Sequence, residues 1–277
     1  MTYGFVGLGQ MGAPMARHLA GPDLIVYDVR AEAMAPFAGK GARPARTLAE
    51  VAAASVISVM VRDDAQVDEV AGALLPAAAR GTVLAVHSTI RARTAETLAE
   101  RARPYGVEVV DAPVSGGFMG ADAGTLAVMV GGSDAAFARV REPFGAFADL
   151  VLHVGSVGAG TRMKLARNLL HFVSFAAAAE AQRLAEAAGV PLGRLGRVVR
   201  HSDAVTGGPG SIMLRRTTAP LEPDDPLYDV MRHVYALGEK DLALALELAD
   251  ELGVDAPLAR LACERLAAGL GLPEEET

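Results

Sequence analysis

The motif Gly7-Leu8-Gly9-Gln10-Met11-Gly12 constrains the fold of this chain more than any other feature. It directly follows an apolar run at Tyr3–Val6 and directly precedes a helix-like segment, which is where a dinucleotide-binding glycine loop stands. In such a loop the first glycine permits the tight turn, the second lets the backbone approach a pyrophosphate, and the third allows close helix packing. The helix N-terminus then stabilises the anion. The alternative is a structural turn punctuated by glycines.

A second apolar run, Leu24–Tyr27, ends in Asp28, at about the offset where an acidic residue meets the adenosine ribose. The order of strand, glycines, helix, strand and acid favours dinucleotide binding over the structural turn. A carboxylate at this position also favours NAD over NADP, because a 2′-phosphate would meet like charge. Arg30, two residues further on, could instead turn toward a 2′-phosphate.

Short β-like apolar runs alternate with helix-like stretches from Tyr3 to about Leu152. This alternation is typical of a wound α/β sheet. Runs such as Val56–Val61 lack polar alternation, as expected when helices cover both faces of a parallel sheet. The expected strands are Tyr3–Val6, Leu24–Tyr27, Val56–Val61, Val83–His87, Val107–Asp111 and Leu126–Val130.

The pattern changes after Val154. A glycine-rich segment at 155–160 leads into about 28 residues rich in Ala and Leu, which stop at Gly189-Val190-Pro191 and predict one long helix. At about 1.5 Å per residue this helix would reach roughly 40 Å, enough to join two domains. The rest of the chain has helical spacing, apart from an expected loop at 207–226. We therefore expect a dinucleotide-binding domain at residues 1–156 and a helical domain at 157–277.

Composition excludes several classes of protein. The chain has 277 residues, 26 Lys+Arg against 33 Asp+Glu, a formal charge of −7 and one cysteine, Cys263. A single cysteine cannot form an internal disulfide, which fits a cytoplasmic setting. Dispersed basic residues argue against a nucleic-acid surface, and no apolar tract approaches the roughly 20 residues of a membrane span. No His/Cys cluster has metal-ligand spacing, so a metal site has no support.

Four ordered motifs resemble the β-hydroxyacid dehydrogenases, a 6-phosphogluconate dehydrogenase-like family that includes 3-hydroxyisobutyrate dehydrogenase and tartronate semialdehyde reductase. They are the glycine loop continued through Ala13-Pro14-Met15-Ala16, then Asp111–Gly117, then Gly158-Ala159-Gly160 with Lys164 and Asn168, and finally Lys240-Asp241-Leu242. The resemblance covers nearly the whole chain. It implies an α/β fold with an N-terminal Rossmann-type wound sheet, a long interdomain helix that carries the catalytic lysine, and an all-helical C-terminal domain for substrate binding and oligomerisation.

The resemblance also implies which residues contact the cofactor. They are Gly7, Gly9, Gln10, Met11 and Gly12 in the glycine loop, Asp28 at the ribose, Val61 and Thr89 after later strands, and Lys240 near the C-terminus. The chain departs from the family where it has Arg62 and Arg91, positions at which many relatives have proline. The alternative for both arginines is a solvated surface position.

For the substrate acid, the resemblance implies binding by Ser115, Gly116 and Gly117, with Asp241 nearby. A serine hydroxyl and unobstructed glycine N–H groups suit a carboxylate, whereas the alternative is an ordinary glycine-rich turn. Lys164 and Asn168 stand four residues apart, so they share one face of the predicted long helix and form the expected catalytic pair.

Other residues on the predicted helices have two interpretations each. His171 continues the face of Lys164 and Asn168 but is more often a packing residue, and Arg167 replaces an asparagine common in relatives. Without the resemblance, Lys240 and Asp241 would be solvent-facing charges. Cys263 has no base or metal ligand near it in sequence, which predicts a buried helical residue.

These features together predict an NAD-dependent oxidoreductase, with NADP as the other cofactor, that interconverts a small 3-hydroxy acid and its semialdehyde or ketone. Lys164 would handle the hydroxyl proton. Two rivals stay open: an NADPH-dependent semialdehyde or imine reductase, and a non-catalytic dinucleotide-binding module. The imine reductases and the non-catalytic relatives generally lack the lysine, so the presence of Lys164 disfavours an imine reductase and a non-catalytic module. The expected partners are a small carboxylate substrate and further copies of the chain, in a homodimer or homotetramer.

Overall fold

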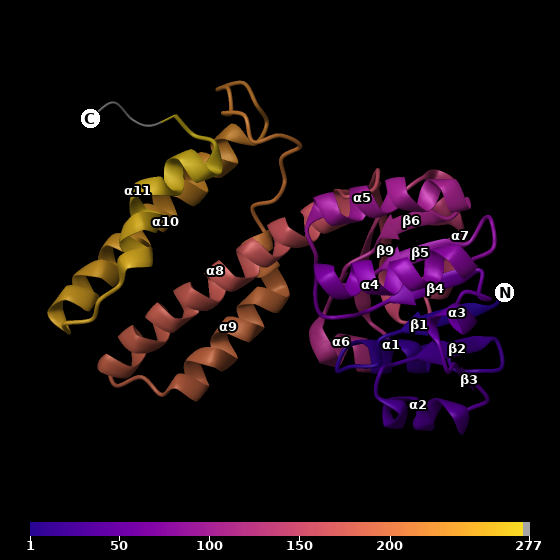
Figure 1. Ribbon diagram of the computed structural model, residues 1–277. Helices are drawn as coiled ribbons and strands as arrows, with labels where there is room; N and C mark the ends of the chain where they lie inside the picture. Colours follow the sequence, from indigo (N-terminus) through magenta and orange to yellow (C-terminus); the bar gives the residue numbers. More distant parts are fainter. Residues whose placement is uncertain (274–277) are drawn as a thin grey trace. The chain divides into compact units, whose positions relative to one another are not determined.

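The computed structural model describes residues 1–273. Over this range the chain forms two compact units, one at Met1–Arg167 and one from Asn168 onward (Figure 1). The strands are β1 (Tyr3–Val6), β2 (Leu24–Tyr27), β3 (Arg43–Pro44), β4 (Val56–Val59), β5 (Val83–Val86), β6 (Glu108–Asp111), β7 (Val114–Ser115), β8 (Leu126–Gly131) and β9 (Ala148–Gly155). The helices are α1 (Gly12–His18), α2 (Ala31–Ala38), α3 (Leu48–Val51), α4 (Asp64–Leu74), α5 (Ala92–Ala102), α6 (Gly117–Ala123), α7 (Asp134–Phe144), α8 (Ala159–Ala187), α9 (Leu192–Thr206), α10 (Tyr228–Glu251) and α11 (Pro257–Leu270).

The first unit is built on one wound sheet. Its strands follow the order β3-β2-β1-β4-β5-β6-β8-β7, with β9 paired to β8. The strands from β3 to β6 pair in parallel, so their carboxyl ends lie along one edge of the sheet. All six strands expected from the sequence are present, and the α/β fold class is confirmed.

The far edge of the sheet differs from the all-parallel expectation. There β8 runs antiparallel to both β6 and β7, and β9 then pairs in parallel with β8. The two residues of β7, Val114 and Ser115, lie within the motif Asp111–Gly117, for which no strand after Asp111 was predicted. Short pairings of this kind depend on residues far away in the sequence, which local periodicity does not reveal.

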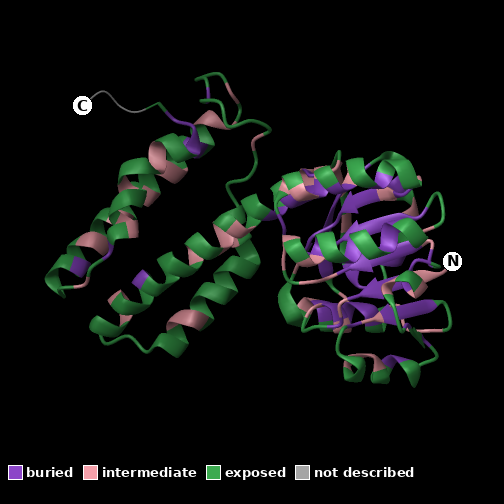
Figure 2. Ribbon diagram, in the orientation of Figure 1, coloured by how far each residue is buried: buried purple, intermediate pink, exposed green. Residues whose placement is uncertain are grey.

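Helices cover both faces of the sheet and bury one apolar cluster on each. Successive strand residues point to opposite faces, so Phe5 joins the cluster with Met15 and Phe144, while Val6 joins the other with Leu74 and further side chains of α4. Figure 2 shows the strands as the most buried part of this unit. This two-sided burial explains why β4 and β5 are apolar at every residue except Ser58.

The second unit is helical, as the sequence predicted. The long helix α8 ends two residues before Gly189, which has a positive φ of 73°. A small cluster of Leu221, Met231, Leu270 and Leu272 joins α10 to the end of α11. The buried carboxylate of Glu180 on α8 accepts backbone hydrogen bonds from Leu258 and Ala259 at the start of α11, at 2.9 and 3.0 Å.

The compact units divide inside α8, between Arg167 and Asn168. The first turn of α8 packs against the sheet: a Cβ placed on Gly160 would lie 2.3 Å from the carbonyl oxygen of Met129. The boundary between the dinucleotide-binding domain and the helical domain, placed between residues 156 and 157, stays a prediction. Over residues 1–273, no helix combines the length and the apolar character needed to cross a membrane.

Candidate functional site

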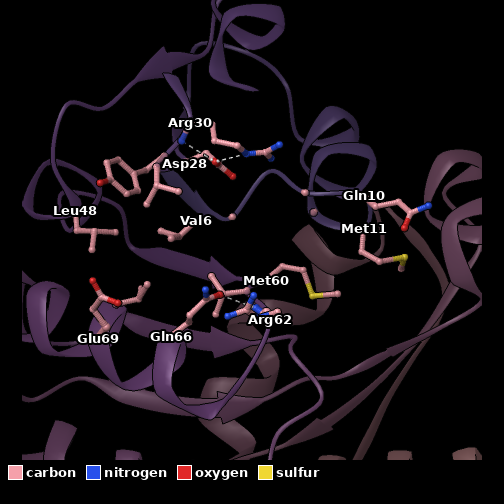
Figure 3. A pocket seen from close by; sticks show the side chains of 17 residues that line it. Val6, Gln10, Met11, Asp28, Arg30, Leu48, Met60, Arg62, Gln66 and Glu69 are labelled. Carbon is pink, nitrogen blue, oxygen red and sulfur yellow. Dashed lines mark hydrogen bonds and ion pairs between the residues drawn. The ribbon is translucent and has the colours of Figure 1, made fainter. Parts of the chain in front are cut away.

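A cavity of about 450 Å³ opens at the carboxyl ends of β1, β2 and β4 (Figure 3). Its floor is the glycine loop after β1, and its walls come from the ends of β2 and β4 and from the start of α4. Most of the predicted cofactor residues line this one cavity: Gly7, Gly9, Gln10, Met11, Gly12, Asp28 and Val61. Parallel α/β sheets bind ligands at this edge, because the strands end there and the loops leave space between the helices.

The three motif glycines meet three different constraints. Gly7 has a φ of +91°, and a Cβ on it would lie 2.2 Å from the carbonyl oxygen of Met60. A Cβ on Gly12 would lie 2.0 Å from the carbonyl oxygen of Gly7, so α1 can approach the strand only without a side chain there. A Cβ on Gly9 would meet nothing within 4 Å, which leaves the backbone open to the cavity. The loop therefore fits a pyrophosphate at Gly9.

Asp28 is held firmly at the end of β2. Its Oδ2 accepts the backbone N–H of Leu8 at 2.7 Å, and its Oδ1 accepts the backbone N–H and the Nε–H of Arg30 at 2.9 and 3.2 Å. Burial raises the pKa of this carboxyl, but the hydrogen bonds from Arg30 and Leu8 outweigh it and hold the pKa below the usual value. Asp28 is thus a fixed anion facing the cavity.

Charged and polar side chains form the rim of the cavity. The backbone N–H of Arg62 donates to Oε1 of Gln66 at 2.9 Å, while its guanidinium lies 3.1 Å from Asp63, and Glu69 lines the same side. The side chains of Arg62 and Arg91 are 80% and 82% exposed, so both arginines are at the surface, and only Arg62 lines the cavity.

Ser88, which follows β5, forms hydrogen bonds with Val61, a residue that lines the cavity. Its hydroxyl accepts the N–H of Val61 at 2.9 Å and donates to the carbonyl oxygen of the same residue at 2.7 Å. Thr89 follows directly but does not line the cavity, so its predicted cofactor contact stays a prediction.

The predicted substrate loop leaves the same edge of the sheet after β6. Ser115 is half-buried, whereas Gly116 and Gly117 are exposed and have φ values of +131° and +62°. A Cβ on Gly116 would lie 2.9 Å from Cδ2 of Leu126, while one on Gly117 would meet nothing within 4 Å. These glycines therefore hold a backbone shape that other residues rarely adopt and leave their N–H groups accessible to an anion.

Lys164 lies on α8 and is only 8% exposed. Burial lowers the pKa of its amine, and the positive charge of Arg167 lowers it further. Asn168 follows one turn later on the same helix. A buried amine with a lowered pKa can take or give a proton nearer to neutral pH than a surface lysine.

Two buried titratable residues were not among the predicted site residues, although Asp111 begins one of the four motifs. Asp111 at the end of β6 is fully buried, and its carboxylate accepts hydrogen bonds from the start of α8. His87 at the end of β5 is 1% exposed and contacts Ala112 and Ser58. An acid that ends a strand just before a glycine-rich loop was the available signal for Asp111.

Lys240 and Asp241 lie on α10 in the second unit. Nζ of Lys240 donates to Oδ1 of Asp241 at 2.6 Å, and both side chains are exposed. Their predicted roles at the cofactor and the substrate stay predictions. In the part of the chain that the structure describes, no three His, Cys, Asp or Glu side chains are grouped so that they could hold a metal ion.

Comparison with known proteins identifies the family. The model for the NAD binding domain of 6-phosphogluconate dehydrogenase matches residues 2–155, and that for the NAD-binding domain of NADP-dependent 3-hydroxyisobutyrate dehydrogenase matches residues 158–272. An uncharacterized oxidoreductase of Mycobacterium tuberculosis is 57% identical over 99% of this chain and 95% of its own length.

Solved structures agree. A putative oxidoreductase from Mycobacterium avium 104 has a TM-score of 0.94 at 54% identity, covering 99% of both chains. The 3-hydroxyisobutyrate dehydrogenase of Mycobacterium tuberculosis, solved with L-serine, has a TM-score of 0.68 at 32% identity, covering 98% of this chain and 95% of its own. The glycine loop, the fixed carboxylate of Asp28 and these matches lead to one conclusion: the chain belongs to the β-hydroxyacid dehydrogenase family and is an NAD(P)-dependent hydroxyacid dehydrogenase.

Proposed function

We propose that this enzyme uses NAD to oxidise a small 3-hydroxy acid, similar to 3-hydroxyisobutyrate, to its semialdehyde, or runs the reverse reduction. The observation that carries the proposal is the buried amine of Lys164 with its lowered pKa. A general acid–base group works best when its pKa lies near the working pH, and burial moves a lysine in that direction.

The residues divide the work between binding and proton transfer. Ser115, with the N–H groups of Gly116 and Gly117, holds the substrate carboxylate by hydrogen bonds. Lys164 takes the proton of the hydroxyl during oxidation and returns it during reduction, and Asn168, one turn away, orients the reacting oxygen. The bound nicotinamide accepts or supplies the hydride.

The carboxylate of Asp28 supports NAD as the preferred cofactor. Both of its oxygens face donors that fix its orientation, and an anion held at the ribose end repels a 2′-phosphate. NADP is the second candidate, since the guanidinium of Arg30 lies 3.2 Å from Asp28 and offsets part of its charge.

The substrate class has support from one relative. The 3-hydroxyisobutyrate dehydrogenase of Mycobacterium tuberculosis was solved with L-serine, which is itself a 3-hydroxy acid. Solved imine reductases share the fold, with TM-scores of 0.76 and 0.77 for two of them, but at 20% and 16% identity this likeness supports the fold alone. An imine reductase that lacks the lysine, or a non-catalytic binding module, would leave the buried Lys164 without a role, whereas a semialdehyde reductase would use it as the proton donor.

We further propose that the enzyme is a homodimer or homotetramer. The helical unit exposes large apolar side chains along α8, including Leu169, Phe172 and Phe175, at 57–71% of their surface. An apolar stripe of this kind favours burial against another copy. Sedimentation velocity across a concentration series tests this, and a monomer at all concentrations contradicts it. A cytoplasmic location stays a prediction.

A substrate panel with both cofactors tests the proposed reaction. We expect turnover of 3-hydroxyisobutyrate, L-serine or a related 3-hydroxy acid with NAD, and poor turnover of simple alcohols without a carboxylate. Two further measurements run in parallel: the reduction of cyclic imines with NADPH, and the binding of NADH by calorimetry. Imine reduction without acid turnover would establish the reductase instead, and NADH binding without any turnover would establish the non-catalytic module.

A further inference from the structure

The carboxylate of Asp111 joins the end of β6 to the beginning of α8. Oδ1 accepts the backbone N–H of Gly158 at 2.7 Å, and Oδ2 accepts that of Thr161 at 2.6 Å. These N–H groups belong to the end of the helix where no intrahelical acceptors exist. Because Asp111 is fully buried, water cannot replace either bond without a rearrangement.

The helix start is packed against the sheet without side chains between them. A Cβ on Gly160 would lie 2.6 Å from the carbonyl oxygen of Asp111, and a Cβ on Gly131 would lie 2.3 Å from its Oδ1. The first turn of α8 and the ends of β6 and β8 therefore touch backbone to backbone. A displacement of the Asp111 carboxylate would therefore also displace the first turn of α8.

The base of the substrate loop is held independently of α8. The backbone N–H of Ala112 donates to the carbonyl oxygen of Val86 at 2.8 Å, and Nδ1 of His87 lies 2.7 Å from the carbonyl oxygen of Ala112, so this nitrogen carries the proton. The loop base therefore has hydrogen bonds that do not depend on the carboxylate of Asp111.

We propose that Asp111 is a positioning residue, which fixes the amine of Lys164 relative to the loop that carries Ser115. Lys164 follows Thr161 by one helical turn, so the N–H of Thr161 and the amine move together. The inference rests on the proposed function in one respect: Lys164 is taken as the proton-transfer group. Burial raises the pKa of the Asp111 carboxyl, because desolvation disfavours its charged form, even though the N–H groups of Thr161 and Gly158 oppose the rise.

The first test is Asp111→Asn, which keeps the shape but gives one of the two N–H groups an amide NH₂ instead of an acceptor. The matched control is Glu180→Gln, which changes another buried carboxylate that accepts two N–H groups at the start of a helix, in this case α11. It removes the same chemistry far along α8 from Lys164. Melting temperatures of both variants establish that they are folded.

The first readout does not depend on catalysis. The chain has three lysines, so acetylation by acetic anhydride can be followed at Lys164 against the exposed Lys40 by peptide mass spectrometry. Measured from about pH 7 to about pH 10, the profile separates the limiting rate of the free amine from its pKa. We expect the limiting rate at Lys164 to rise by about threefold or more in Asp111→Asn, and to stay unchanged in Glu180→Gln.

The second readout is steady-state kinetics of the NAD-loaded enzyme. We expect kcat to fall about tenfold or more in Asp111→Asn, because small misplacements of a reacting group are costly, with a smaller change in KM for the acid. A folded Asp111→Asn whose Lys164 labelling and kcat both match those of Glu180→Gln would overturn the proposal.

If Asp111→Asn does not fold, Thr161→Pro removes one of the two N–H donors and leaves Asp111 intact. The same changes, smaller in size, are then expected, and their absence overturns the proposal. Failure of the proposed function is a separate outcome. In that case the Lys164→Ala variant would keep its activity. The labelling of Lys164 in the Asp111→Asn variant would still differ from that in the wild type.

Discussion

Oδ2 of Asp28 accepts the backbone N–H of Leu8 across 2.7 Å, so the acid that ends β2 and the glycine loop that follows β1 hold each other in place. Three donors from Leu8 and Arg30 approach the carboxylate, and a carboxylate has about four acceptor sites. Acceptor capacity therefore remains for a ribose hydroxyl.

Cofactor preference should respond in opposite directions to two substitutions at this contact. In Asp28→Asn the like charge that opposes a 2′-phosphate is gone, so the ratio of kcat/KM for NAD to that for NADP should fall about tenfold or more. In Arg30→Ala the carboxylate loses its partner, and the same ratio should rise. Wild-type preference for NADP, or an unchanged ratio in Asp28→Asn, would contradict the assignment.

Ser115→Ala should raise KM for the substrate acid more than KM for the matched amide, because the hydroxyl donates to a carboxylate more strongly than to a neutral carbonyl. The control is Ser133→Ala, which removes a hydroxyl that accepts the N–H of Ala136 at the start of α7. That control should leave both KM values unchanged. Equal effects of Ser115→Ala on acid and amide would show that the loop does not recognise the carboxylate.

Lys164→Ala should lower kcat by about a hundredfold or more and leave NAD binding nearly unchanged, because the residues that line the cofactor cavity stay intact. Lys164→Arg is the sharper variant, since it keeps the positive charge but does not release a proton. It should also lose oxidation activity. NADH fluorescence titration measures the binding, and retained turnover in either variant argues against the proton-transfer role.

The pH profile should depend on Arg167. Burial and the charge of Arg167 lower the pKa of Lys164, and oxidation needs the unprotonated amine, so kcat for oxidation should rise as pH rises through that lowered pKa. Reduction needs the protonated amine and should show the opposite limb. In Arg167→Gln the pKa of Lys164 rises, and both limbs should move to higher pH. If neither limb of the pH profile moves in Arg167→Gln, the group that controls the profile is not Lys164.

Stability should fall in acid because of His87. Burial lowers the pKa of this imidazole to about 4, from an ordinary value of 6.5 in the unfolded chain. The unfolded state therefore binds the proton first: the contribution is complete above about pH 6.5 and is lost as pH falls to about 4, by roughly 3 kcal/mol. His87→Gln keeps a polar side chain at this position but does not titrate, so its unfolding free energy should depend less on pH. Parallel urea-unfolding profiles of the two proteins would contradict this.

Much of the fold could be predicted from the sequence because it depends on neighbouring residues. The apolar runs at Leu24–Tyr27 and Val83–His87 form strands, the second ending one residue early at Val86, and the long helix ends before Gly189 as expected. The strands β3, β7 and β9 were not predicted, and β3 and β7 have only two residues each. Two residues are too few for a periodic pattern, and β9 alternates irregularly between buried and exposed positions.

The candidate site also has features that neighbouring residues determine and features that depend on distant ones. The sequence by itself determined the glycine loop, the acid at Asp28 and the lysine at position 164, because a turn, a strand end and a helix face are set by residues within about twenty positions. Only the tertiary structure decided that Arg62 lines the cavity while Arg91 does not, and that Asp111 accepts the N–H groups of α8. The physical reason is that a side chain's hydrogen-bond partners and burial depend on which distant segments pack beside it, and a carboxylate such as that of Asp111 has the same local sequence whether it faces water or a helix end 50 residues away.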